Sequence, residues 1–167
     1  MGYGVISIAK GKPELMVIGV LDQRRLSDHF KKISRIFERT LQLIDEYKPD
    51  VMAIEAPFYG KNVQSLLKLG RAQGAAISAA LYRSVPVFEY APRKIKLSIT
   101  GYGNASKEQV AIMLQKILKI KILPENLDAT DGLAAAMCHF YGKSINSALS
   151  GKKSWKTFVR ENPDRIK

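Results

Sequence analysis

The start of the chain constrains the fold most, because it predicts a β-hairpin that begins almost at the first residue. Apolar-rich runs over 3–8 and 15–20 flank the turn-like segment Lys-Gly-Lys-Pro at 10–13, and such a pair is typical of two antiparallel strands. An apolar strand without a neighbour on one side leaves a row of backbone groups unpaired, which proteins normally cover. We therefore expect a further strand beside this hairpin.

The rest of the chain alternates between helical and strand patterns. Apolar residues at spacings of three and four predict an amphipathic helix that Pro49 helps to end; they are Phe30, Ile33, Phe37, Leu41 and Ile44. The other expected elements are a short buried strand over 51–55, a helix over 62–81, a strand over 85–90, a short helix over 92–99, a helix from a capping box at Ser106 and Gln109 to about 120, and a core helix over 126–142. This order predicts an α/β domain with a mixed sheet flanked by helices.

A strong positive charge favours a polyanionic partner. The chain has 27 Lys and Arg against 15 Asp and Glu, a formal net charge of +12, and such a protein attracts phosphate backbones without reading their sequence. Nucleic acid is the expected partner, and a generic basic surface is the alternative. The sequence has neither a membrane-spanning apolar stretch nor a signal-peptide pattern. We therefore expect a soluble, cytoplasmic protein without a membrane partner.

Composition divides the chain near residue 142. Residues 1–142 are expected to form one domain, in which Cys138 packs inside an apolar helix and does not react. Residues 143–167 hold seven basic and two acidic residues and form either a flexible basic tail or a short docking helix. Small residues in the helix over 62–81 suit close packing on the sheet or, alternatively, self-association.

Three carboxylates have apolar neighbours. Glu55 ends the strand over 51–55, and Asp128 and Asp131 are three residues apart, on one face of a helix. The two aspartates could merely cap the helix and favour its dipole. Carboxylates from separate elements at one sheet edge are, however, what Mg²⁺ needs, and on a basic protein they suggest two-metal phosphodiester hydrolysis. Two ions normally need a fourth carboxylate, and the residues supply no candidate: Asp50 lies at the far end of Glu55's strand, and Asp22 suits a turn.

Four motifs in order resemble one known family. "GYGVI", "AIEAPFYGKNVQSLLKLGRAQGAA", "VFEYAPRKIKLSITGYGNASKEQV" and "DATDGLAAAMCH" are together similar to the RuvC-type Holliday junction resolvases, over residues 2–142. The resemblance implies a ribonuclease H-like fold, a homodimer and two Mg²⁺ ions. It further implies a crossover junction endodeoxyribonuclease that nicks two strands of four-way DNA junctions symmetrically in recombination and repair. The implied working partner is a branch-migration complex of the RuvA and RuvB type.

The resemblance also assigns roles to individual residues. Glu55, Asp128 and Asp131 match three of the family's four metal ligands, and Lys96 and Lys107 match two lysines near the active centre. The implied DNA-binding residues are Phe58, Tyr59, Lys61, Asn62, Arg93, Lys96 and Lys107, with Phe58 stacking on a base near the crossing point. Alternatively, Phe58 and Tyr59 form a hydrophobic lid over the core. Lys96 and Lys107 could likewise be ordinary solvated charges. His139 does not match a metal ligand and is expected to pack or to lie at the surface.

One feature departs from the family pattern. The family's first strand ends in Asp-Pro-Gly a few residues before "GYGVI", and its Asp is the fourth metal ligand, whereas this sequence starts at Met1. We expect the domain to lack this strand, either because an internal Met was taken as the start or the chain was trimmed, or because the protein is a shortened relative. The shortened form would bind four-way junctions as a dimer without cleaving them. A different ribonuclease H-like nuclease that acts on RNA is a third hypothesis.

Overall fold

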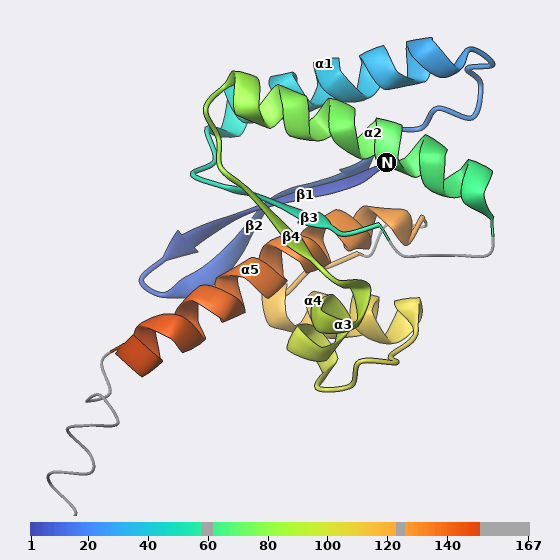
Figure 1. The fold of residues 1–167 in the computed structure, drawn as a ribbon. Helices are drawn as coiled ribbons and strands as arrows, with labels where there is room; N and C mark the ends of the chain where they lie inside the picture. Colours follow the sequence, from blue (N-terminus) through green and yellow to red (C-terminus); the bar gives the residue numbers. More distant parts are fainter. Residues whose placement is uncertain (58–61, 123–125, 151–167) are drawn as a thin grey trace, which may run out of the picture.

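The strands form a middle layer between two groups of helices (Figure 1). The computed structural model describes the backbone of residues 1–57, 62–122 and 126–150, and side chains as far as Lys143. Helices α1 and α2 lie on one side of the strands, and α3, α4 and α5 lie on the other. This order agrees with the predicted α/β class.

The predicted hairpin is confirmed. Strand β1 (Gly2–Ala9) pairs antiparallel with β2 (Lys12–Val20), and Ala9 lies opposite Lys12. Lys10 and Gly11 form the turn with φ values of 52° and 74°, which matches the left-handed turn geometry that closes tight hairpins. The hairpin pairing continues to Met1, whose carbonyl accepts a hydrogen bond from the Leu21 amide at 2.8 Å.

A second pair of strands is parallel. Strand β3 (Met52–Glu55) pairs with β4 (Val87–Tyr90), so that Glu55 lies opposite Tyr90 at the carboxyl end of both strands. The strand directions are therefore mixed, as predicted, but the described strands form two separate two-stranded sheets. Met52, Ala53 and Ile54 are only half-buried, although the sequence predicts a buried strand. Their exposure has its cause in the gap beside β3, described below.

Helices α1 (His29–Tyr47) and α2 (Val63–Tyr82) pack together on one side of the strands. The predicted amphipathic helix is present, and Ile33, Phe37 and Leu41 of its predicted stripe are half-buried. The fully buried residues are Ile36, Thr40, Leu43 and Ile44, so the buried face is shifted from the predicted stripe. Of the stripe expected from the sequence, Ile44 is buried and Phe30 is 76% exposed. Phe30 lies in the first turn of α1, where it has little protein to pack against.

The other side carries three helices: α3 (Pro92–Thr100), α4 (Lys107–Leu118) and α5 (Asp128–Ser150). The predicted capping box is present, since Ser106 Oγ accepts from the Gln109 amide and Gln109 Oε1 accepts from the Ser106 amide. Helix α5 continues past residue 142, where the composition changes, and residues 151–167 lie outside the described chain. In the described part of the chain, no helix has the length and apolarity needed to cross a membrane.

The larger part of the core lies between the strands and α3 to α5. Leu114, Leu133 and Met137 are fully buried there, and Cys138 is 1% exposed, as predicted for a packing residue. A smaller cluster lies on the other side of the strands. It contains Ile44 of α1 and Ala80 of α2, against which Met52 of β3 and Val87 of β4 pack. The two clusters show that both faces of the strand layer are covered.

Candidate metal and nucleic-acid site

The first turn of α5 carries two aspartates at the end of the strand layer. Asp128 and Asp131 lie in this turn, where a helix favours negative charge. β1 begins directly against it: a Cβ added at Gly132 would lie 2.7 Å from the Tyr3 Cα, and one at Gly2 would lie 1.6 Å from the Asp128 carbonyl oxygen. Glycine at both positions thus lets the strand and the helix approach closely, which holds the aspartates at the start of β1.

Lys107 joins the two aspartates. Its Nζ lies 2.6 Å from Asp128 Oδ1 and 2.9 Å from Asp131 Oδ2. The hydrogen bond from Lys107 lowers the pKa of Asp128 below its ordinary value. Partial burial alone would lower the pKa of Lys107, but the hydrogen bonds to both aspartates outweigh it and raise that pKa. The two carboxylates therefore hold one cation between them at neutral pH.

Glu55 lies near this pair, at the end of β3. Withdrawal from water raises the pKa of its carboxyl group, the charge of Asp131 raises it further, and Lys107 and Lys96 oppose the rise. The backbone of Glu55 is also held, because Gln73 Nε2 of α2 donates to its carbonyl oxygen. The sequence analysis did not identify Gln73, because nothing in a helical pattern indicates which distant strand a polar side chain will contact.

The donor set fits one hard cation. Asp128 and Asp131 already bind the Lys107 ammonium, and Glu55 adds a third carboxylate close enough to be repelled by Asp131. Carboxylate oxygens are the ligands that Mg²⁺ prefers. The described side chains include no group of three or more potential ligands already gathered into a metal-binding arrangement. A cation bound by all three would thus have to displace the ammonium and draw Glu55 toward the aspartates.

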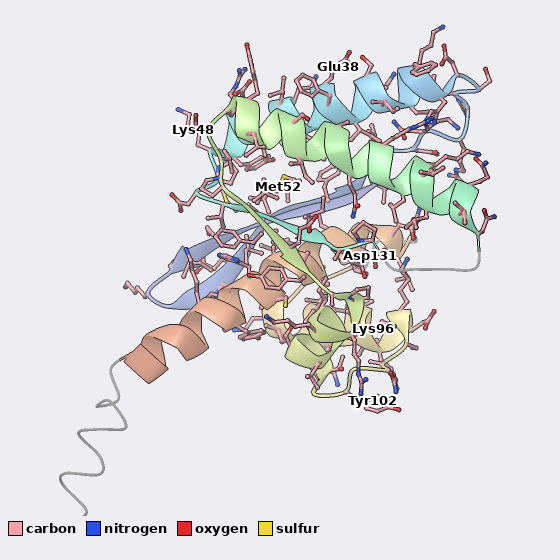
Figure 2. All side chains as sticks on the ribbon, in the orientation of Figure 1. Glu38, Lys48, Met52, Lys96, Tyr102 and Asp131 are labelled. Atoms are coloured by element: carbon pink, nitrogen blue, oxygen red, sulfur yellow. The ribbon has the colours of Figure 1, made fainter. Side chains whose placement is uncertain are left out.

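Helix α3 carries two of the predicted residues, Lys96 and Arg93, and Lys96 lies near the carboxylates. Lys96 of α3 acts on Glu55 through its charge, and Figure 2 shows Lys96 and Asp131 at the same end of the strand layer. Arg93 is exposed in the first turn of α3, and its side chain lies over Gly103. Lys107 and Lys96 therefore bring two positive charges to the three carboxylates, and within the described chain Arg93 forms no ion pair with them.

The loop between β3 and α2 was predicted to contact DNA. Phe58, Tyr59 and Lys61 lie outside the described residues. Asn62 is described, and its side chain caps α2 by accepting from the Ser65 amide at 3.1 Å. The cap gives Asn62 a structural role, and its contact with DNA remains a prediction.

A cavity of about 1350 Å³ lies between β1 and β3 and reaches the carboxylates. The residues Gly2 to Ile8 of β1 and Met52 to Glu55 of β3 line it from opposite sides. Helices α1 and α2 cover it on one face and α5 covers it on the other. We call this cavity the strand-layer slot; Glu55 and Asp131 are both among its lining residues.

His139 lines the same slot and packs as predicted. The ring is 7% exposed and stacks at a tilt against Phe88, with 4.6 Å between ring centroids. Its Nδ1 lies 2.7 Å from the Tyr90 hydroxyl, while its buried Nε2 has no hydrogen-bond partner among the described residues. Burial lowers the pKa of His139, and the charge of Lys143 lowers it further.

The comparisons with known proteins agree with this geometry. Residues 1–139 match the family model of the crossover junction endodeoxyribonuclease RuvC. The chain belongs to this family. The RuvC of Porphyromonas gingivalis is 56% identical over 173 residues, which cover 100% of this chain and 91% of that protein.

Solved RuvC structures have the same fold. The Thermus thermophilus RuvC structure aligns with a TM-score of 0.76 and 31% identity, over 86% of this chain and 88% of that one. The T. thermophilus RuvC in complex with a Holliday junction substrate aligns with a TM-score of 0.78 and 30% identity, over 86% and 87%. The predicted ribonuclease H-like, mixed α/β fold is therefore confirmed, and the chain is a member of a family of endonucleases.

Proposed function

We propose that this RuvC-family chain is a Mg²⁺-dependent endonuclease that nicks four-way DNA junctions symmetrically in recombination and repair. The observation that carries the proposal is the Lys107 ammonium held between Asp128 and Asp131, with Glu55 beside them at the end of β3. The site thus combines oxygen ligands for a metal with a cation that can meet a phosphate. The related Thermus enzyme, solved with a Holliday junction substrate, supports the choice of DNA.

Glu55, Asp128 and Asp131 would hold the metal. Bound Mg²⁺ would supply Lewis-acid chemistry for phosphodiester hydrolysis, and the family pattern implies two ions. Lys107, once displaced from the aspartates, is placed to bind a phosphate oxygen next to them. Lys96 adds positive charge beside Glu55.

The DNA would lie over the end of the strand layer at which the carboxylates are gathered. Phe58 and Tyr59 would stack on unpaired bases, and Lys61, Asn62 and Arg93 would contact the backbone. The net charge of +12 supports this proposal, because phosphate contacts dominate the affinity of such proteins.

We propose a homodimer that associates through α2. Val63, Leu67 and Leu81 of this helix are exposed, and a Cβ added at Gly70 or Gly74 would meet no atom within 4 Å. These glycines serve no close contact within the described chain, so their small size suits approach by a second copy. By family resemblance, the dimer would act in the cytoplasm with a branch-migration complex of the RuvA and RuvB type.

The second candidate is a dimer that binds junctions without cleaving them. The observation that favours it is the small donor set: Glu55, Asp128 and Asp131 are the carboxylates that the described residues bring to this edge. Three carboxylates should hold two Mg²⁺ ions poorly. The basic surface would still bind DNA.

A nicking assay on a labelled four-way junction separates the two candidates. The 167-residue chain and a version with an added strand ending in Asp-Pro-Gly are compared with Mg²⁺ and with a chelator. We expect junction binding by both and Mg²⁺-dependent symmetric nicking by the extended version. The same extension with Asn for Asp should bind junctions without nicking them. Efficient nicking by the 167-residue chain would contradict the non-cleaving candidate.

Three substitutions in the extended version test the ligand assignment. Glu55→Gln, Asp128→Asn and Asp131→Asn should each abolish nicking and leave junction affinity unchanged or higher, because each removes negative charge near phosphate. Nicking and gel-shift affinity are measured in parallel. Loss of folding or of junction binding in all three variants would show that these residues are structural.

A further inference from the structure

The peptide group that follows Glu55 is held from two sides. Its amide, that of Ala56, donates to the Tyr90 carbonyl of β4 at 2.9 Å. Its carbonyl, that of Glu55, accepts a hydrogen bond from Gln73 Nε2 of α2. Both polar groups of this peptide therefore have partners, one in the strand layer and one in a helix. The backbone that carries the Glu55 carboxylate thus depends on α2 for one of its two anchors.

Helix α2 is anchored unevenly. Its fully buried residues within the described chain are Ala76, Ala79 and Ala80, all in the second half of the helix. Residues 63–71 are exposed apart from one half-buried leucine. Packing supplies most of the stability of a helix in a protein, and the first half of α2 has little of it. Gln73 lies at the boundary between the two halves, where it is half-buried.

One side of α2 is open and largely apolar. Five residues at spacings of three, four and seven share this side: Val63, Leu67, Gly70, Gly74 and Leu81. The two leucines and the valine are exposed, and a Cβ added at either glycine would meet no atom within 4 Å. We call this side the dimer face. One helix thus carries both the dimer face and the Gln73 contact with Glu55.

We propose that Gln73 is a positioning residue, which couples the dimer face of α2 to metal binding at Glu55. A second copy packed on the dimer face holds α2 in place, and Gln73 then holds the Glu55 backbone before the cation arrives. Binding to a group that is already ordered costs less conformational entropy. The inference rests on the proposed function, because the metal site and the dimer come from it.

A coupling of this kind acts in both directions. If the dimer binds Mg²⁺ more tightly than the monomer, Mg²⁺ must strengthen the dimer by the same factor. Couplings between two sites are typically about fivefold or larger. The effect is therefore measurable on the protein alone, without DNA and without cleavage.

Sedimentation equilibrium of the 167-residue chain tests the coupling. The dissociation constant of the dimer is measured in MgCl₂ and in NaCl of equal ionic strength. We expect Mg²⁺ to lower this constant by at least about fivefold. A dimer of equal strength in both solutions would overturn the coupling and leave the proposed dimer and nuclease standing. A chain that is monomeric in both solutions would overturn the coupling together with the proposed dimer.

Gln73→Met isolates the hydrogen bond to Glu55. Methionine is a flexible, unbranched side chain that fills a similar space but has no N–H to donate. The variant should keep the thermal midpoint of the parent protein, bind Mg²⁺ at least about fivefold more weakly in isothermal titration, and lose the effect of Mg²⁺ on the dimer. A lower midpoint with the effect of Mg²⁺ on the dimer unchanged would show a purely structural role and overturn the proposal.

The matched control lies on the same helix. Gln64 is exposed in the first turn of α2, so Gln64→Met makes the same chemical change away from Glu55. Its dimer should respond to Mg²⁺ as the parent dimer does. Equal responses of Gln73→Met and Gln64→Met would overturn the role of Gln73.

Gly74→Phe tests the coupling from the dimer face. Position 74 is open within the described chain, so the single chain should accept the ring, whereas a closely packed second copy should not. We expect a shift toward monomer and a weaker affinity for Mg²⁺ at concentrations where the parent protein is dimeric. A monomeric Gly74→Phe variant that binds Mg²⁺ as tightly as the parent dimer would overturn the proposal.

Discussion

The Lys107 ammonium lies 2.6 Å from Asp128 Oδ1, on the pair of carboxylates where we propose that Mg²⁺ binds. A metal ion must compete with this ammonium in the absence of DNA. Lys107→Ala should therefore raise the affinity of the DNA-free protein for Mg²⁺, by up to about fivefold, because an exposed ion pair contributes only about 0.2–1 kcal/mol. Isothermal titration with Mg²⁺ measures the change.

The matched control for Lys107 lies on the same helix. Lys116 is exposed in the last turn of α4, so Lys116→Ala should leave Mg²⁺ affinity unchanged. An unchanged or weaker affinity in Lys107→Ala would contradict the competition. DNA cleavage should nevertheless fall in Lys107→Ala, because the variant loses its proposed phosphate contact.

Glu55 should make stability depend on pH. Its folded pKa lies above the ordinary value of 4.5, because of its withdrawal from water and the charge of Asp131. The ionised form is thus unfavourable in the folded protein, and stability is lost as the pH rises through the folded pKa. Glu55→Gln should therefore be more stable than the parent protein at pH 7 and equally stable below about pH 4.5. Urea denaturation at both pH values measures the difference.

Asp128 should make the free energy of unfolding depend on pH in the opposite direction. Its folded pKa is lowered by the hydrogen bond from Lys107, so its contribution to stability is present at neutral pH and is lost as the pH falls. Asp128→Asn should be less stable than the parent protein at pH 7 and should lose this deficit on acidification. The assigned pKa direction of Glu55 would be wrong if Glu55→Gln were less stable than the parent protein at pH 7. That of Asp128 would be wrong if Asp128→Asn were more stable than the parent protein at pH 7.

The contact between β1 and α5 should tolerate no side chain at Gly132. Gly132→Ala would place a Cβ 2.7 Å from the Tyr3 Cα, and backbone atoms yield little, so we expect a loss of about 1–3 kcal/mol in the free energy of unfolding. Gly142→Ala is the control on the same helix, because an added Cβ there meets nothing within 4 Å. It should stabilise α5 by about 0.5–1 kcal/mol. Equal effects of the two substitutions would refute the close contact.

Phe58 should contribute more to the nicking of junctions than to the binding of duplex DNA. Stacking on a base contributes about 1–3 kcal/mol and requires an unpaired base. We expect Phe58→Ala, in the extended version, to slow junction nicking while duplex affinity changes little. Nicking rates and duplex gel shifts on the same preparation test this, and an equal loss on both substrates would exclude the stacking role.

The sequence determined the elements whose signals are local. The turn between β1 and β2 and the capping box of Ser106 and Gln109 need only neighbouring residues, since their hydrogen bonds close within a few positions. The motifs around Glu55, Asp128 and Asp131 likewise predicted the family without any coordinates. Burial along α1 was harder to predict, because the surrounding layers decide which side of a helix is covered, and they left Phe30 exposed.

Only the tertiary structure decided how distant segments meet. Lys107 and Asp128 are 21 residues apart, and no local pattern predicts that the lysine bridges both aspartates. Gln73 reaches the Glu55 carbonyl because α2 crosses the end of β3. The half-exposure of Met52 and Ile54 has the same kind of cause, because both residues line the slot between β1 and β3 and have no neighbour on that side in the described chain. Sequence patterns record each residue's preference for burial, whereas burial itself requires a neighbour in space.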